Sequence, residues 1–101
     1  MTNKLLSAVL DADISDHSTK GKDVELWSDS SGRSMRSRIN VYELMHLMKQ
    51  WAFVQGYIIE SDITGWYRVS KDECYIGVDG TTTTEPEAVT LACEFIFKET
   101  T

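Results

Sequence analysis

Four side chains near the N-terminus have the types and the close spacing of a metal site. Asp11, Asp13, Asp16 and His17 would place several ligand atoms in one short segment, as a hard cation such as calcium requires. A calcium loop also needs a glycine at its turn and a glutamate at its twelfth position, and this segment supplies neither. Solvated acids at a helix end are therefore the favoured interpretation, and we expect no metal and no cofactor.

Other catalytic motifs are missing from the sequence. No serine lies in a G-x-S-x-G elbow, and no glycine-rich segment has the spacing of a phosphate loop. Carboxylates from Asp62, Asp72 and Asp79 could pair for acid–base chemistry, but their positions at turns between predicted strands favour solvent. We therefore predict that the chain is not an enzyme, and a small metal-dependent enzyme is the third of three functional hypotheses.

The two cysteines, Cys74 and Cys93, leave two alternatives open. Their even number permits a disulfide, although two cysteines are far fewer than a disulfide-stapled secreted domain contains. Buried free thiols in a cytoplasmic protein are the favoured interpretation, because free cysteine packs as a small apolar residue.

The single basic cluster consists of Arg33, Arg36 and Arg38, within the Ser- and Gly-rich segment 28–38. This segment has no apolar period, so we predict a flexible loop there. Guanidinium groups on a loop suit the recognition of phosphate or carboxylate. The alternative, which we favour, is a solubilising loop. Three arginines contact few phosphates, so this pattern does not favour direct nucleic-acid binding.

Helix and strand signals place these residues on a fold of the α+β class. Apolar periodicity and capping residues predict a short N-terminal helix over 3–10 and two main helices over 40–55 and 85–98. Short alternating runs separated by turn residues predict strands over 57–61, 66–70 and 74–78. Connections this short exclude crossover helices, so the three strands form an antiparallel meander packed with the two main helices. We predict one domain, residues 1–101, and one further short strand over 24–27.

Charge is unevenly distributed along the chain. The net charge is −6, and residues 60–101 hold nine acidic and only three basic side chains. An acidic surface repels nucleic acid and favours a basic protein partner.

No apolar run approaches the roughly 20 residues of a membrane span, so we expect a cytoplasmic protein that does not bind membranes. We expect Trp51 to lie in the core, and Trp66 to be free as an anchor for a partner.

The segment Gly80 to Val89, with a threonine-rich turn, the helix start Thr84-Glu85-Pro86-Glu87-Ala88-Val89 and a final helix, resembles the C-terminal part of small accessory proteins of tailed phages and prophages. The resemblance covers about twenty residues and is mostly a good helix cap. It implies a phage-encoded protein that acts in the host cytoplasm, often against a host system, and it assigns no functional residue.

The leading functional hypothesis is a non-catalytic protein-binding module, an inhibitor of a host system that binds a basic host surface through an acidic face. The alternative is a structural or assembly protein that self-associates through its apolar helices, because the last helix is apolar over a wide part of its surface. The candidate partner-binding residues are Asp62, Trp66, Asp72, Glu73, Asp79, Arg33, Arg36 and Arg38.

Overall fold

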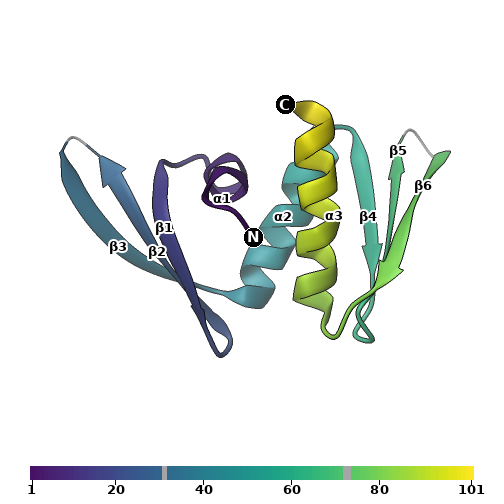
Figure 1. Ribbon diagram of the computed structural model, residues 1–101, viewed down its shortest axis with the longest axis horizontal. Coiled ribbons are helices and arrows are strands. Elements are labelled where there is room, and N and C mark those ends of the chain that lie inside the picture. The colour runs from purple at the N-terminus through teal and green to yellow at the C-terminus, as the bar shows by residue number, and fades with distance from the viewer. Residues whose placement is uncertain (31, 72–73) are drawn as a thin grey trace.

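Three helices and six strands make up the computed structural model, which describes residues 1–30, 32–71 and 74–101 (Figure 1). In chain order they are α1 (Asn3–Leu10), β1 (Ile14–Lys20), β2 (Asp23–Ser30), β3 (Arg33–Asn40), α2 (Val41–Val54), β4 (Tyr57–Ser61), β5 (Trp66–Lys71), β6 (Cys74–Thr81) and α3 (Glu85–Thr100). The predicted α+β class is confirmed.

All three predicted helices are present, and their caps explain where they begin. The Asn40 side chain accepts a hydrogen bond from the backbone N–H of Tyr42 at the start of α2. The Thr84 hydroxyl accepts one from the N–H of Glu87 at the start of α3. Each cap satisfies a donor that the first helical turn leaves without a partner.

The predicted meander is also present. Strands β4, β5 and β6 pair antiparallel in that order, and we call them sheet B. The Cα register pairs Glu60 with Arg68 and Arg68 with Asp79. A bulge between Val69 and Ser70 shifts the remainder of β6, so that Ser70 lies opposite Tyr75.

A second three-stranded sheet, β1–β2–β3, was not predicted, and we call it sheet A. The prediction of a flexible loop over 28–38 is wrong. Residues 28–30 belong to β2 and residues 33–38 to β3, and the two strands pair along their whole length. Residues 33–38 are all exposed, since β3 is an edge strand with solvent beside it. A strand that buries almost nothing shows no apolar alternation in its sequence. The predicted strand over 24–27 lies within β2.

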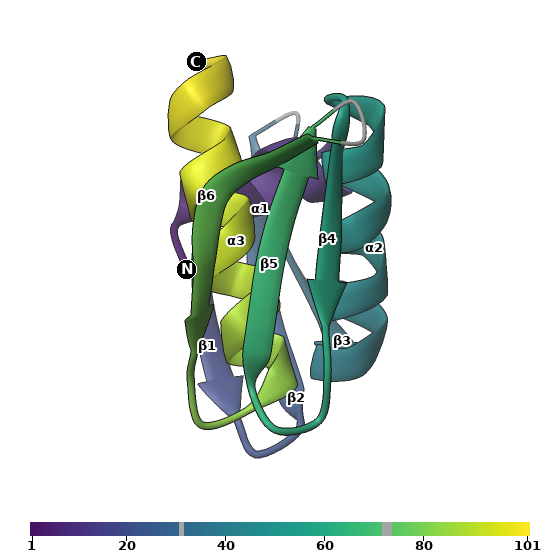
Figure 2. The same cartoon turned by 90° about the vertical axis from the view of Figure 1, so that its right-hand side faces the viewer.

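The helices lie between the two sheets, as Figure 1 shows. Figure 2 looks onto sheet B with α2 and α3 behind it. The buried stripe of α3, which includes Val89, Cys93 and Ile96, belongs to the same core as Val69 of sheet B and Leu6 of α1. Trp51 is half-buried, packs against this core and lies 6.2 Å from the ring of Phe97. Within the part of the chain that the structure describes, no helix has the length and apolar character to cross a membrane.

Candidate functional site

The outer face of sheet B carries a cluster of large side chains that are left outside the core. Val69 is fully buried, so its neighbours Arg68 and Ser70 face outward, because successive residues of a strand alternate between faces. Trp66 lies on the outer face for the same reason. We call this surface the sheet-B face and define it by six residues, Ile58, Glu60, Trp66, Arg68, Tyr75 and Asp79.

Arg68 is the centre of the sheet-B face. Its guanidinium carbon lies 5.7 Å from the ring centroids of both Trp66 and Tyr75, a distance at which cation–π attraction acts. One terminal nitrogen lies 3.3 Å from the carboxylate of Glu60. The buried Nε has no hydrogen-bond partner among the described residues. The arginine is thus held in place by two rings and one carboxylate while 42% of its side chain stays exposed.

Tyr75 and Asp79 complete this arrangement on β6. The pKa of the Tyr75 phenol is raised above 10.0, mainly by partial burial and secondly by the hydrogen bond to Asp79. The tyrosine therefore stays neutral at physiological pH and presents an exposed ring. Trp66, the second aromatic residue on this face, is half-buried. The rings of Trp66 and Tyr75 can therefore form the apolar part of an interface.

The structure brings only some of the sequence-predicted residues together. Trp66 and Asp79 share the sheet-B face. Asp62 lies beside them in the β4–β5 turn, where its carboxylate accepts hydrogen bonds from the N–H of Thr64 (2.9 Å) and of Trp66 (3.4 Å) and from the Thr64 hydroxyl. The Thr64 hydroxyl bond is the main reason that the pKa of Asp62 is lowered. Asp72 and Glu73 lie outside the described residues.

The three arginines lie on sheet A, on the far side of the helices (Figure 1). Arg36 donates to the carboxylate of Glu25 at 2.8 Å, and Arg38 approaches the same oxygen at 3.5 Å. Arg36 also lies 5.7 Å from the ring centroid of Trp27. Arg33 follows the alternation of the opposite face, so the cluster does not act as one site. Glu25, whose side chain is only 6% exposed, was missed by sequence reasoning.

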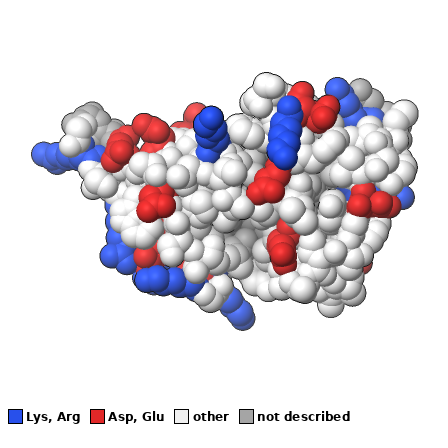
Figure 3. Space-filling view, in the orientation of Figure 1, with Lys and Arg blue, Asp and Glu red and all other residues white. Residues whose placement is uncertain are grey.

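The acidic residues of the C-terminal part are dispersed over the molecule. Glu94 pairs with the N-terminal amine at 3.0 Å, and Glu85 pairs with Lys49 at 3.7 Å. In Figure 3 basic and acidic side chains are interleaved, with several basic ones over the end that sheet A forms. Glu85 and Glu94 are therefore each paired with a positive group.

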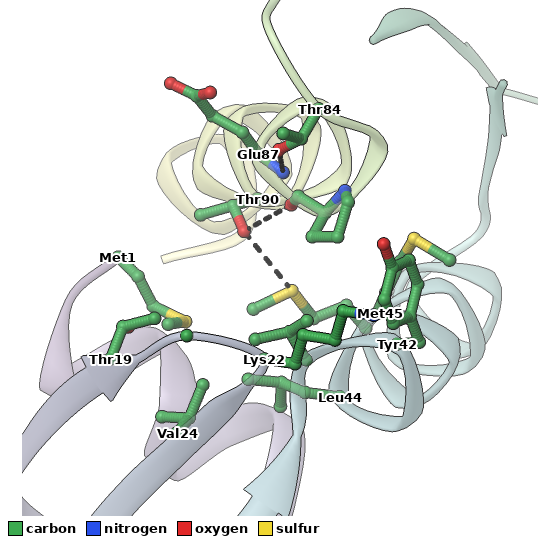
Figure 4. Close-up of a pocket in the computed structure, with 14 residues that line it drawn as sticks. Met1, Thr19, Lys22, Val24, Tyr42, Leu44, Met45, Thr84, Glu87 and Thr90 are labelled. Atoms are coloured by element: carbon green, nitrogen blue, oxygen red, sulfur yellow. Dashed lines mark hydrogen bonds between the residues drawn. The ribbon is translucent and has the colours of Figure 1, made fainter. Parts of the chain in front are cut away.

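A cavity of about 460 Å³ lies on the other side of α2 and α3 from sheet B. Its lining comes chiefly from the β1–β2 turn, the first half of α2 and the start of α3 (Figure 4). Sequence reasoning missed it, because the three segments are far apart in the chain and their proximity depends on the packing of sheet A.

The remaining candidates from the sequence form no reactive site. Among the described residues no group of three or more histidine, cysteine or acidic side chains is placed to hold a metal. His17 instead contacts the side-chain oxygen of Asn3. Both cysteines are free; the prediction of buried thiols holds for Cys93 but is wrong for Cys74, which is exposed because it begins the edge strand β6.

Four members of the sheet-B face were missed by sequence reasoning: Ile58, Glu60, Arg68 and Tyr75. The position of Arg68 two residues after Trp66 was a usable signal, since such residues share a face of a strand. Tyr75 had no such signal, because its place depends on the bulge at Val69 and Ser70.

Comparison with protein-family models, curated proteins and solved structures finds no match for this chain.

Proposed function

We propose that this chain is a non-catalytic protein-binding module that binds a basic surface of a partner through the sheet-B face. The observation that carries the proposal is the cluster of Trp66, Arg68 and Tyr75 on the outside of an antiparallel sheet. Tryptophan, tyrosine and arginine are the residues most enriched among the hot spots of protein interfaces. Here both rings lie within cation–π distance of Arg68 and outside the core.

Charge supports a basic partner. On and beside the sheet-B face, Glu60, Asp62 and Asp79 are acidic, and Arg68 is the basic residue that faces outward among them. Arg68 balances one of these carboxylates, so the local surface keeps a negative excess. Such an excess accelerates encounter with positively charged partners and opposes phosphate backbones.

The burial of α3 favours a different protein as the partner over a second copy of this chain. The apolar stripe of α3 is covered by α2 and sheet B, with Ala88, Val89, Ala92, Cys93 and Ile96 fully buried. Two copies that associated through α3 would therefore bury little further apolar surface on this helix. Leu91, which is 41% exposed, is the large apolar side chain of α3 that remains accessible. Together with the resemblance to phage accessory proteins, this favours an inhibitor that occupies a basic site on a host protein.

The proposal is tested with two matched double variants used as bait for a bacterial lysate at low salt. W66A/D79K removes an anchor and reverses a charge on the sheet-B face. W27A/D29K makes the same changes on the outer face of sheet A, where Trp27 is half-buried and Asp29 exposed. We expect wild type and W27A/D29K to retain a partner that W66A/D79K loses.

The retained partner is then titrated with the purified chain. Loss of a hot-spot tryptophan costs about 2 kcal/mol or more, which is roughly thirtyfold in Kd. Affinity should also fall with added salt. A partner that W66A/D79K still binds and W27A/D29K does not would contradict the proposal. A dimer in sedimentation experiments at micromolar concentration would favour the assembly hypothesis instead.

A further inference from the structure

The cavity beside α2 and α3 exists because sheet A touches the helices only in part. Sheet A contacts α1 along β1 and contacts α2 where β3 leads into it. The N–H of Val41, the first residue of α2, donates to the carbonyl of Lys22 at 2.8 Å and holds the β1–β2 turn against the helix. Beside this junction the cavity opens between the β1–β2 turn, the start of α2 and the start of α3 (Figure 4).

The interior of the cavity is apolar. Val24 of β2 and Leu44 and Met48 of α2 form its buried part, with exposures of 0%, 3% and 1%. Met45 and Met1 add two more flexible thioether side chains to the lining. Methionine adapts its shape to an occupant better than branched residues do. The volume of about 460 Å³ lies within the 300–1,000 Å³ usual for sites that bind one small molecule.

The polar atoms at the rim are mainly donors. Lys22, Tyr42 and Thr19 line the mouth and are exposed, and no ion pair among the described residues includes Lys22. The acid at the rim, Glu87, accepts a hydrogen bond from the Thr83 hydroxyl at 2.6 Å. In Figure 4 its carboxylate points away from the other lining side chains. The Thr90 hydroxyl donates to the carbonyl of Pro86 at 2.8 Å and also lies 3.8 Å from the sulfur of Met48 (Figure 4).

We propose that this groove binds a small molecule with an unbranched aliphatic body and one carboxylate, of the size of a medium-chain fatty acid. The aliphatic body lies against Val24, Leu44 and Met48, and the carboxylate lies at the rim within reach of Lys22 and Tyr42. This site is separate from the sheet-B face, since α2 and α3 lie between the two. The inference therefore does not depend on the proposed partner of the sheet-B face.

The wild-type chain is titrated by calorimetry with hexanoate, octanoate and decanoate, each below its micellar concentration. Affinity should rise roughly fourfold with each added methylene, which corresponds to the ~0.8 kcal/mol of a buried methylene. Amide chemical shifts measured with decanoate should change in residues 41–48 and 84–90. The sheet-B face serves as the internal control and should show no change.

Three variants locate the ligand. K22Q should weaken decanoate binding by up to about fivefold, the scale of an exposed ion pair, without weakening binding of the uncharged decanol. K98Q is the matched control, because Lys98 is an exposed lysine at the other end of α3. T90L fills the groove from α3 and should weaken both ligands, with circular dichroism verifying that the variant is folded.

Several results would overturn the inference without any variant. These are the absence of saturable binding, an affinity that does not depend on chain length, shifts that map to sheet B, or binding of decyltrimethylammonium as tight as that of decanoate. Equal effects of K22Q and K98Q on decanoate would overturn the assignment of the carboxylate to Lys22.

Discussion

Gly65 provides the sharpest test of how the sheet-B face is held in place. It lies in the β4–β5 turn directly before Trp66, is buried, and has a φ of +91°. Its carbonyl accepts hydrogen bonds from the N–H of Thr82 (2.8 Å) and from the Thr82 hydroxyl (3.2 Å). Figure 2 shows the β4–β5 turn beside the segment that leads from β6 into α3. Gly65 therefore joins the turn before Trp66 to the segment that precedes the last helix.

A Cβ atom at Gly65 would overlap the backbone of Thr82, with the carbonyl carbon only 2.7 Å away. Gly56 has nearly the same backbone angle, φ +94°, but a Cβ atom there meets nothing within 4 Å. The substitution Gly56→Ala thus measures the cost of a positive φ alone, about 1–2 kcal/mol. Gly65→Ala adds the displacement of Thr82 and with it one or two hydrogen bonds, each worth roughly 0.5–1.5 kcal/mol.

Urea unfolding monitored by tryptophan fluorescence gives both values. We expect Gly65→Ala to lower the free energy of unfolding by about 1.5–5 kcal/mol, which is about 0.5–3 kcal/mol more than the loss in Gly56→Ala. The slope with denaturant should stay unchanged, so that the midpoint alone reports stability. Equal losses in the two variants would refute the contact between Gly65 and Thr82, and with it the described support of Trp66.

Two further predictions concern buried groups. The hydrogen bond from Arg36 keeps the pKa of Glu25 below 4.5, so its stabilisation is complete above that pH and is lost as the pH falls through the folded-state value. Unfolding free energies measured from pH 6 to pH 3 should therefore fall more steeply for wild type than for Glu25→Gln, and parallel curves would contradict this. Burial raises the pKa of the Cys93 thiol to about 12, whereas Cys74 is exposed. A thiol reagent at pH 8 should modify Cys74 rapidly and Cys93 only in denaturant; rapid loss of both thiols from the folded chain would be inconsistent with the structure.

The helices and sheet B could be predicted because their sequences carry two agreeing signals each. For α2 and α3 these are a capping residue and an apolar period, at Asn40 and Thr84 and along the stripes that follow. Sheet B has alternating strands bounded by turn residues, and Tyr57 and Ile59 of β4 are buried as the alternation requires.

Sheet A could not be predicted in full because its apolar content is concentrated in one strand. β2 buries Val24 and Leu26, whereas β1 buries Ile14 alone and β3 only partly buries Ile39. The polar strands on either side are held by pairing with β2 and by ion pairs to Glu25. Cross-strand interactions of this kind leave no periodic signal within either strand, so serine and arginine were read as a loop.

The same feature of sheet A explains why the molecule has a groove on one side of its helices and not on the other. Sheet B turns Val69, Tyr57 and Ile59 toward α2 and α3, and the resulting layer is closed. Sheet A has fewer apolar side chains to offer and meets the helices chiefly through α1 and the junction at Val41. The uncovered part of α2 therefore faces a cavity, with Met45 and Met48 in its lining. A chain that repeats the order of three strands and a helix thus obtains two different surfaces, an outer aromatic face on sheet B and an apolar groove beside sheet A.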